Sequence, residues 1–389
     1  MINFNGLNAI DPLNKYSISH NLESCPHGTI YSTSDYSKVK IDFSSNINPF
    51  GISKFVLREI KNNIVQTSHT YPDPKCTSLK KSISEYIRCD SDQNWITVGN
   101  GATEIIHNFV RSLCLKNSII PSPTFCEYEL ASKRCGMTIH YIPLSKKLHI
   151  EPDSIIEKVK KNPNSLIFLC NPNNPTGLVD TKAIEKILTS INNYKTILMI
   201  DESFIEFLSE MRKNSMISRI KEFENLTVLR SMTKSFGLAG LRLGYIIANP
   251  KITQRLKSYQ IAWNVNGIAQ IAGIAALKDQ AFLLNARKTI RKEREYMYNK
   301  INLNKTKVKA LRSQVNFFLI KLKNVDSISY QKILLKDYGI LVRDCSTFSG
   351  VLSNHFIRVA VRKHNDNLKL LKAIYEINTN FDKYKVILG

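Results

Sequence analysis

The sequence has few acidic residues and no long hydrophobic run. It carries 32 Asp and Glu residues against 55 Lys and Arg residues, so its formal net charge is +23 over 389 residues. No stretch approaches the ~18–20 consecutive apolar residues that a membrane helix needs. Residues 1–17 also lack the apolar core of a signal peptide. We therefore expect no membrane partner and no secretion signal, and a cytoplasmic location.

The shortage of acidic residues leaves a nucleic-acid-binding function open. However, Lys, Asn and Ile recur throughout the chain, and neither a dense basic run nor a repeated aromatic–basic pattern stands out. This even distribution indicates that the positive charge reflects the general composition of the chain and not a surface that binds nucleic acid. We therefore expect no nucleic-acid partner, although a basic surface attracts small anionic substrates.

The cysteines lack the spacing of a metal site. None of the eight forms a C-x-x-C pair, and no histidine cluster accompanies them at the spacing of a zinc site. We therefore expect no bound metal. Scattered cysteines in a chain without a secretion signal indicate reduced thiols.

Short apolar runs alternate with helical patterns from about residue 94 to residue 248. The runs are Trp95–Val98, Ser118–Ile120, Ile139–Pro143, Leu166–Leu169, Thr196–Ile200, Leu226–Arg230 and Gly244–Ala248. This alternation predicts an α/β fold in which helices cover both faces of a mostly parallel sheet.

The pattern changes after Trp263. A long charged helix is predicted over Ile268–Ile301, and a last helix around Asn367–Ile377. The strands predicted between them are Phe317–Lys321, Ile340–Arg343 and Phe356–Val361. These elements are typical of a smaller α+β domain. We divide the chain into an N-terminal arm (residues 1–45), a large domain (46–265) and a small C-terminal domain (266–389).

One lysine stands in surroundings that suit covalent chemistry. Lys234 follows a predicted strand in the segment SMTKSFGLAGLRLGY (231–245), with hydroxyl residues beside it and Arg242 eight positions later. A lysine that forms a Schiff base must be held near its neutral form in an enclosed site. Hydroxyls and an arginine can bind a phosphate ester by charge-assisted hydrogen bonds. Taken alone, the segment is also compatible with a solvated loop.

Three further segments place polar groups at the ends of predicted strands. Asp201 follows the run Thr196–Ile200, at the edge where α/β sheets bind ligands, although aspartate also caps helices. Asn174 lies in the turn NPNNPTG, where an amide can bond a ring hydroxyl. The segment GNGATE (99–104) precedes a helix whose N-terminal N–H groups can bind phosphate. It is not a Rossmann fingerprint, because Glu104 replaces the third glycine, and no Gly-Lys-Ser/Thr follows to make a P-loop.

The order of these segments resembles the fold-type I superfamily of pyridoxal-phosphate (PLP) enzymes, to which the aminotransferases belong. The matching order is GNGATE, PTFCEY, NPNNPTG, DESF, SMTKSFGLAGLRLGY and an arginine in FIRVA. The resemblance covers about Asp42 to Ile377. It implies a large domain with a mostly parallel sheet, a smaller α+β C-terminal domain, PLP as cofactor and a symmetric homodimer.

The resemblance assigns a role to each matching position. Lys234 would hold PLP through a Schiff base and move protons, and Asp201 would pair with the pyridinium nitrogen, which keeps the ring an electron sink. Asn174 would bond the ring hydroxyl and Phe125 would stack on the ring. Tyr71 would reach the phosphate of the neighbouring subunit's cofactor. The residues implied to hold the phosphate are Gly101, Ala102, Thr103, Ser231, Thr233 and Arg242.

Within the superfamily, the sequence resembles two families that act on phosphorylated amines or amino acids. They are the histidinol-phosphate aminotransferases and the threonine-phosphate decarboxylases of cobalamin biosynthesis. The features that favour the decarboxylases are His27-Gly28, DFSSNINPFG (42–51), Phe204, WNVN (263–266) and ILVRDCSTFSG (340–350). In three places the sequence departs from its relatives. Thr29 replaces a glycine, Ser203 replaces an alanine, and Phe204 removes a tyrosine that in many relatives touches the ring hydroxyl.

The decarboxylase resemblance also places residues at the substrate. They are His27, Gly28, Asn46, Asn174, Arg343 and Arg358, of which Arg358 matches the arginine that binds the substrate carboxylate by a two-pronged contact. We expect a small phosphorylated amino acid as substrate, and decarboxylation of L-threonine O-3-phosphate to (R)-1-aminopropan-2-ol phosphate. Transamination of the histidinol-phosphate type stays open, because sub-ångström placement decides which bond breaks. Decarboxylation of L-serine phosphate stays open too, because that substrate differs by one methyl group.

Overall fold

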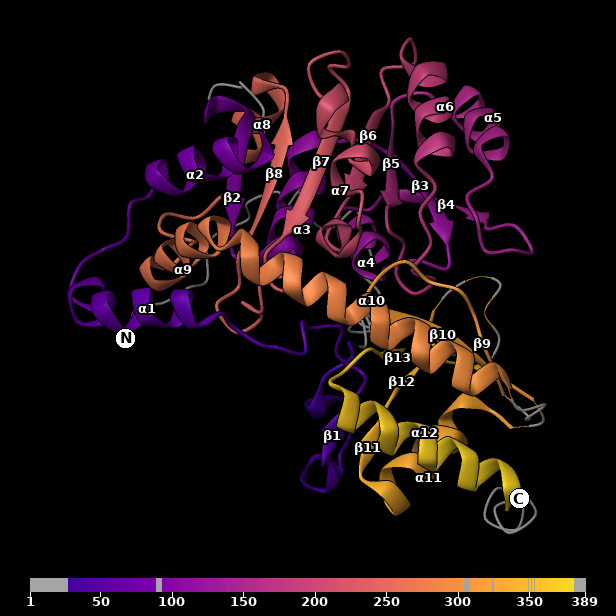
Figure 1. Ribbon diagram of the computed structural model, residues 1–389. Coiled ribbons are helices and arrows are strands. Elements are labelled where there is room, and N and C mark those ends of the chain that lie inside the picture. Colours follow the sequence, from indigo (N-terminus) through magenta and orange to yellow (C-terminus); the bar gives the residue numbers. More distant parts are fainter. Residues whose placement is uncertain are drawn as a thin grey trace, which may run out of the picture.

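The larger part of the molecule is built on a seven-stranded sheet in the order β2-β8-β7-β6-β5-β3-β4 (Figure 1). The computed structural model describes residues 27–88, 93–303, 308–323, 325–348, 350, 352 and 354–380. The strands are β2 (Ile96–Gly99), β3 (Asn117–Ser122), β4 (Thr138–Pro143), β5 (Ser165–Cys170), β6 (Ile197–Asp201), β7 (Leu226–Ser231) and β8 (Gly244–Ala248). Strand β8 runs antiparallel to both neighbours, and the other pairs are parallel. The predicted α/β fold with a mostly parallel sheet is confirmed.

Helices cover both faces of this sheet, and each face has its own hydrophobic core. One core contains residues of α2 (Thr77–Ile87), α5 (Pro152–Lys161), α6 (Thr181–Ile191) and α9 (Gly267–Lys278). The other contains residues of α3 (Gly101–Leu113), α4 (Glu127–Arg134) and α8 (Pro250–Lys257). Because successive side chains of a strand face opposite sides, Leu169 of β5 joins the first core and Phe168 the second.

The smaller part combines an antiparallel sheet with helices. The sheet has the order β12-β13-β10-β9, and a separate pair joins β1 to β11 in parallel. These strands are β1 (Ile41–Asp42), β9 (Val308–Ala310), β10 (Phe317–Leu322), β11 (Ile340–Leu341), β12 (Arg343–Asp344) and β13 (Phe356–Ala360). The helices are α11 (Ser327–Tyr338), α12 (His364–Thr379) and α10 (Gln280–Leu303), which extends from the large part into the small one (Figure 1).

Two predicted elements are divided in the structure. The single helix predicted over Ile268–Ile301 is wrong, because α9 ends at Lys278 and α10 begins at Gln280. The Asp279 carboxylate accepts a hydrogen bond from the Phe282 N–H at 3.2 Å, so this residue caps the second helix. The strand predicted over Ile340–Arg343 is also divided: β11 pairs with β1, whereas β12 pairs with β13.

The division into an arm, a large domain and a small domain stays a prediction. Residues 1–26 of the predicted arm lie outside the described residues. The packing favours a domain boundary after α9, because Ala269, Ala272 and Leu277 of this helix belong to the core of the large sheet. Phe43 belongs instead to the core of the small domain, next to strand β1. We therefore propose that the chain passes from the large to the small domain within α10.

Few features outside the site bear on function. None of the helices in the described residues is long and apolar enough to cross a membrane. Within the same residues, no group of three His, Cys, Asp or Glu side chains is placed to hold a metal ion. Free thiols are found at Cys76, Cys114, Cys135, Cys170 and Cys345. Cys126 is disulfide-bonded, so the expectation of reduced thiols is wrong there. The spacing of cysteines along a chain does not reveal which ones approach in space.

Candidate active site

A cavity of about 410 Å³ lies where the sheet of the large domain meets the small domain and the N-terminal region. The residues that the sequence predicted and that line it are His27, Gly28, Asn46, Ala102, Thr103, Phe125, Asn174, Asp201, Ser231, Thr233, Lys234, Arg242, Arg343 and Arg358. Residues separated by more than 300 positions in the chain therefore meet in one place. Since β6 ends at Asp201 and β7 at Ser231, the cavity lies at the carboxyl ends of parallel strands, where α/β sheets bind ligands.

Lys234 lines this cavity and is partly buried, and its surroundings disfavour the ammonium form. Burial lowers the pKa of its amine to about 8, and the positive charges of Arg358 and Arg242 contribute to the shift. The Asp201 carboxylate acts in the opposite direction. A substantial fraction of the Lys234 amine is therefore neutral near pH 8, as attack on a carbonyl requires.

The lowered pKa gives a prediction about pH. In the cofactor-free protein, covalent attachment of PLP to Lys234 should speed up as the pH rises through about 8, because the ammonium then loses its proton. Above that pH the rate should level off, whereas a solvated lysine would keep gaining reactivity up to about pH 10.4. Stopped-flow absorbance of the cofactor provides the measurement. A rate that keeps rising beyond pH 9 would contradict the burial argument.

Asp201 is held by a residue whose role the sequence did not reveal. The Tyr128 hydroxyl donates to Asp201 Oδ2 at 2.6 Å, and the Ser203 N–H donates to Oδ1 at 2.8 Å. Burial raises the pKa of Asp201, and these hydrogen bonds oppose the shift. A buried carboxylate of this kind suits a cationic partner in the cavity, such as a protonated pyridine nitrogen. Tyr128 lies in the quoted segment PTFCEY, but its direction could not be read from the sequence.

The segment GNGATE and the end of β7 form a cradle for a phosphate. Gly101 has φ +85°, and a Cβ at this position would lie 2.5 Å from Nη2 of Arg242. Glycine therefore lets the arginine approach the beginning of α3. The hydroxyl oxygens of Ser231 and Thr233 are 2.7 Å apart, beside the same cavity. An arginine, two hydroxyls and the first turn of a 13-residue helix provide the donors that a phosphate ester needs.

Arg358 connects the small domain to the cofactor side of the cavity. One of its nitrogens, Nη1, donates to the side-chain oxygen of Asn174, and Nη2 donates to the Ser44 carbonyl at 2.8 Å. Its Nε atom is buried and finds no hydrogen-bond partner among the described residues. Burial lowers the pKa of this guanidinium to about 10, and the positive charge of Arg343 contributes. Arg358 is thus a buried cation whose charge an anionic ligand would balance.

The N-terminal region closes the cavity next to Arg358. A Cβ on Gly28 would lie 2.2 Å from the Ser44 carbonyl oxygen and 3.2 Å from Nη2 of Arg358, so only glycine fits there. The Ser45 hydroxyl donates to the Gly28 carbonyl at 3.1 Å. Asn46 also lines the cavity, and its side-chain oxygen is buried without a hydrogen-bond partner in the described residues. This oxygen is therefore positioned to accept a bond from a ligand.

Arg343 provides a further cation from the edge of the small domain. It donates to the Thr347 hydroxyl at 2.8 Å and lies over the ring of Phe348, 5.3 Å from the ring centre. Burial lowers the pKa of Arg343. Phe348 lines the cavity as well, although the sequence did not single it out. The apolar ring fixes the guanidinium without neutralising its charge.

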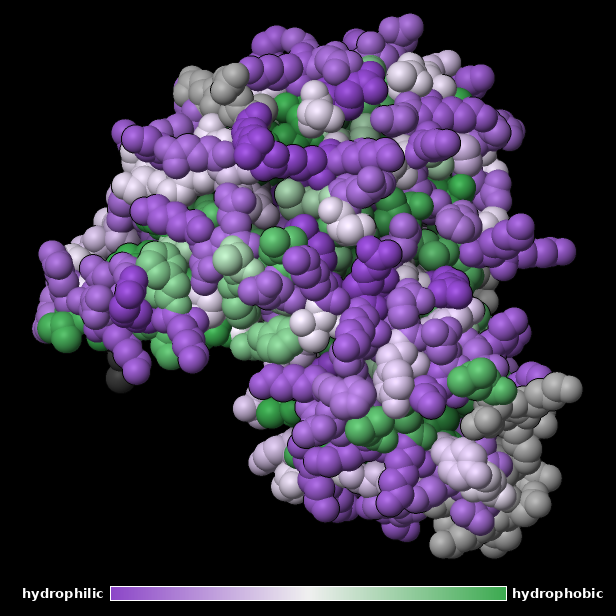
Figure 2. Space-filling view, in the orientation of Figure 1, coloured by the Kyte–Doolittle hydropathy of each residue, from purple (hydrophilic) through white to green (hydrophobic). Residues whose placement is uncertain are grey.

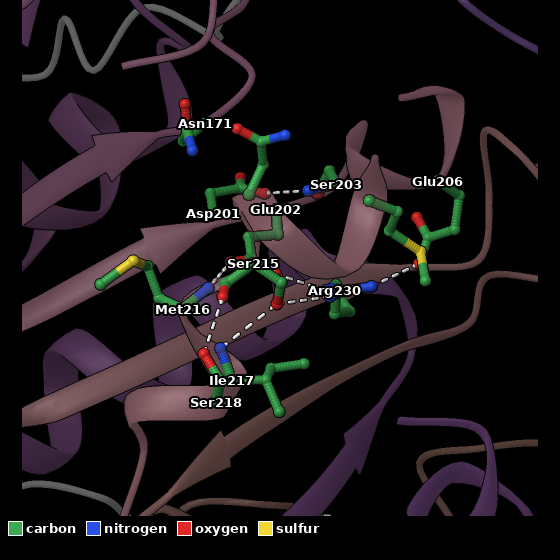
Figure 3. A network of polar contacts seen from close by, with 12 residues as sticks. Asn171, Asp201, Glu202, Ser203, Glu206, Ser215, Met216, Ile217, Ser218 and Arg230 are labelled. Atoms are coloured by element: carbon green, nitrogen blue, oxygen red, sulfur yellow. Dashed lines mark hydrogen bonds and ion pairs between the residues drawn. The ribbon is translucent and has the colours of Figure 1, made fainter. Parts of the chain in front are cut away.

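Behind the cavity, Figure 3 shows a network of buried polar side chains around Arg230. Its Nε atom donates to Glu202 Oε2 at 2.7 Å and its Nη1 atom to Glu206 Oε1 at 2.6 Å. Glu202 directly follows Asp201, the last residue of β6, and Arg230 directly precedes Ser231, the last residue of β7. The ion pair therefore joins the two strand ends that carry predicted cofactor residues. Removing one partner of such a buried pair costs about 3–5 kcal/mol.

Tyr71 does not line the cavity of its own chain. Its side chain is 81% exposed, and its ring stacks on that of Trp263 with 4.6 Å between the ring centres. Phe204 also lines the cavity, but its apolar ring has no hydroxyl. It therefore cannot make the second contact to the ring hydroxyl of PLP that a tyrosine makes in many relatives. The remaining polar groups fit PLP: a partly buried lysine, a buried carboxylate and groups that could hold a phosphate lie around one cavity.

Comparisons with known proteins agree with this fold. A family model described as aminotransferase class I and II matches residues 38–374. A protein provisionally named threonine-phosphate decarboxylase, from Caldanaerobacter subterraneus subsp. tengcongensis, is 38% identical over 369 residues, which cover 93% of this chain and 96% of the relative.

Solved structures give the same picture. The histidinol-phosphate aminotransferase of Clostridium acetobutylicum is 33% identical, with a TM-score of 0.81 over 87% of this chain and 99% of that one. The L-threonine-O-3-phosphate decarboxylase of Porphyromonas gingivalis is 26% identical, with a TM-score of 0.75 over the same shares. A histidinol-phosphate aminotransferase of Sinorhizobium meliloti, solved in complex with PLP, is 21% identical over 94% of this chain and 99% of that one, and shares the fold with a TM-score of 0.82.

Proposed function

Because the chain belongs to the aminotransferase class I and II family, whose members depend on PLP, we propose that it decarboxylates L-threonine O-3-phosphate. The product would be (R)-1-aminopropan-2-ol phosphate, which serves the synthesis of the cobalamin side chain. The relative named for this activity is 38% identical, and four of the five decarboxylase-like segments contribute residues to the cavity, whereas WNVN (263–266) does not.

The observation that carries the proposal is an excess of cationic groups in the cavity. In our assignment Arg242 binds the cofactor phosphate and Asp201 binds the ring nitrogen, and two more buried cations, Arg343 and Arg358, line the same cavity. A substrate with both a carboxylate and a phosphate uses these donors, whereas a simple amino acid uses only part of them. The cavity therefore suits a small amino acid that carries a second anion.

In this proposal the residues of the chain orient the substrate and move one proton. Bound PLP supplies an electron sink that weakens the Cα bond perpendicular to its ring. Arg358 and Arg343 hold the substrate anions and so decide which bond takes that direction. The Lys234 amine, whose pKa is about 8, then delivers a proton to Cα after carbon dioxide has left.

Two other reactions fit the same cavity. A histidinol-phosphate-type aminotransferase is supported by the 33% identity to the Clostridium acetobutylicum enzyme, and its substrate also combines an amine with a phosphate. Decarboxylation of L-serine phosphate differs by one methyl group, which in an apolar pocket contributes about 1–3 kcal/mol to discrimination.

Analysis of the products separates these reactions. The PLP-loaded enzyme should release carbon dioxide and 1-aminopropan-2-ol phosphate from L-threonine phosphate, and it should turn over L-serine phosphate more slowly. Formation of the ketone from histidinol phosphate, with 2-oxoglutarate as amino-group acceptor and no release of carbon dioxide from L-threonine phosphate, would refute decarboxylation. His27→Ala adds a second criterion, because only the decarboxylase resemblance gives His27 a function. An unchanged rate on L-threonine phosphate in this variant would count against the proposal.

We further propose that the active unit is a symmetric homodimer. Figure 2 shows hydrophobic side chains over the α1 (Lys54–Ser68) end of the large domain. The exposed apolar residues of this region are Leu57, Ile64, Val65, Tyr71, Ile261 and Trp263. A patch of this kind is typical of an interaction surface. It contains Tyr71, the residue that the family resemblance assigns to the neighbouring subunit's phosphate.

The homodimer leads to a prediction about Tyr71. Tyr71→Phe removes the hydroxyl but keeps the ring on Trp263, so the variant should stay dimeric while it binds PLP about 10-fold more weakly. Sedimentation gives the mass and titration of cofactor absorbance gives the affinity. A fully active monomer at assay concentrations would contradict the proposed assembly.

A further inference from the structure

A buried carboxylate links two histidines at the entrance to the cavity. Glu127, the first residue of α4, is only 5% exposed. Its Oε1 atom lies 2.7 Å from Nε2 of His27, and its Oε2 atom lies 2.8 Å from Nε2 of His107. His27 lines the cavity, whereas His107 belongs to α3, the helix that begins at the phosphate cradle. The cluster therefore connects the N-terminal region to the helix that we assign to the cofactor.

The position of this carboxylate needs an explanation. A buried negative charge next to a cavity for anionic ligands repels those ligands unless a cation lies between them. Burial alone would raise the pKa of Glu127, but the hydrogen bonds from His107 and His27 lower it to about 2. Glu127 is therefore ionised at every pH at which the protein is expected to work. The histidine between Glu127 and the cavity is His27.

We propose that Glu127 is a positioning residue that makes His27 a hydrogen-bond donor to the substrate's phosphate group. The proposal deepens the proposed function and rests on it, because it assumes that the substrate is phosphorylated. In this proposal Glu127 orients His27. The Glu127 carboxylate does not contact the substrate but acts through His27.

The inference follows from how an imidazole ring donates and accepts hydrogen bonds. A phosphate dianion has only acceptor atoms, so a histidine binds it well only by donating an N–H. Because the Nε2 atom of His27 is engaged by Glu127, the proposal assigns the phosphate to the other ring nitrogen, Nδ1. In a neutral ring that donates from Nε2, Nδ1 is an acceptor and would repel the phosphate. A ring that meets an acceptor at each nitrogen must donate from both, and the proposal gives His27 the acceptors Glu127 at Nε2 and the phosphate at Nδ1.

The second histidine holds the carboxylate in place. Because Oε2 of Glu127 bonds to His107, the carboxylate cannot rotate away from His27 without losing that contact. The rings of His27 and Phe125 are 5.8 Å apart, so the imidazole also lies against the residue assigned to the cofactor ring. The arrangement fixes the direction of the His27 ring before a substrate arrives, which lowers the entropic cost of binding.

Glu127→Gln is the informative variant, because glutamine has the same shape but no charge. Its amide offers one acceptor and one donor group, so it cannot accept from both histidines as the carboxylate does. The dissociation constant of O-phospho-L-threonine, measured from the change in cofactor absorbance, should rise about 10-fold to 100-fold, as expected for one charge-assisted hydrogen bond. The dissociation constant of L-threonine, which has no phosphate, should change less than about 2-fold.

Two controls separate positioning from a general structural role. Glu129→Gln alters a neighbouring carboxylate of α4 that pairs with Lys133, and it should leave both dissociation constants unchanged. The double variant His27→Ala/Glu127→Gln should bind O-phospho-L-threonine no more weakly than His27→Ala alone, because Glu127 acts through His27. Additive losses in the double variant would overturn the proposal, and so would equal losses for the phosphorylated and unphosphorylated ligands.

A further variant keeps the proposal testable if Glu127→Gln does not fold. Glu127→Asp retains the charge but is too short to reach both imidazoles, so the preference for the phosphorylated ligand should fall. An unchanged preference would overturn the proposal. The result is distinguishable from failure of decarboxylation: if the enzyme transaminates histidinol phosphate instead, the same comparison of histidinol phosphate with histidinol applies. A wild-type enzyme without any preference for a phosphorylated ligand would overturn the inference as well.

Discussion

Lys234→Ala should lower turnover by at least about 10³-fold, because the variant loses both covalent attachment of the cofactor and the proton donor to Cα. The phosphate cradle formed by Gly101, Ser231, Thr233 and Arg242 is untouched, so PLP should still bind non-covalently. Borohydride treatment followed by peptide mass analysis gives the measurement. The wild type should carry the reduced cofactor on Lys234 and the variant should carry none.

Two further substitutions test the role of this amine. Lys234→Arg keeps a positive charge at this position but cannot form a Schiff base at neutral pH, so it should be as inactive as the alanine variant. Lys251→Ala removes an exposed lysine of α8 and should leave activity unchanged. Substantial activity and a borohydride-reducible link in Lys234→Ala would refute the assignment.

Arg358→Ala and Arg343→Ala should each cost about 2–4 kcal/mol in kcat/KM, which corresponds to about 30-fold to 1000-fold. Each substitution leaves a substrate anion without a charged donor in a cavity that buries both arginines. The loss should be the larger at Arg358, because this side chain also fixes Asn174 and the Ser44 carbonyl. Steady-state kinetics on L-threonine phosphate gives both values.

The affinities for substrate and product distinguish the roles of the two arginines. The product amine has lost the carboxylate, so Arg358→Ala should weaken binding of 1-aminopropan-2-ol phosphate less than binding of L-threonine phosphate. Arg312→Ala is the matched control, since Arg312 is exposed and pairs with Glu295, and neither residue lines the cavity. Wild-type kinetics in Arg358→Ala would show that the carboxylate is bound elsewhere.

The chain order of the segments already predicted the fold, and it assigned the residues that we propose to hold the cofactor. Alternating apolar runs fixed the strands of the large sheet, because a parallel strand that is buried on both faces must be apolar along its length. Asp201 and Ser231 could be placed at one edge, because the carboxyl ends of neighbouring parallel strands meet there. Helix breaks were harder to predict: the sequence on either side of Asp279 is helical, and only its cap on Phe282 divides α9 from α10.

The remaining parts of the site depend on contacts between distant segments. Tyr128 bonds Asp201 across 73 positions, and Glu127 bonds His27 across 100, so no local pattern could reveal either pair. The sequence by itself determined the strands of the large sheet, because each strand follows from the residues of one segment, and it singled out Lys234 as the proposed cofactor lysine from the residues around it. Only the tertiary structure decided that Glu127 faces His27 and that Arg358 reaches Asn174. Such pairings depend on how strands, helices and the N-terminal region pack, and long-range packing leaves no periodic trace in the chain.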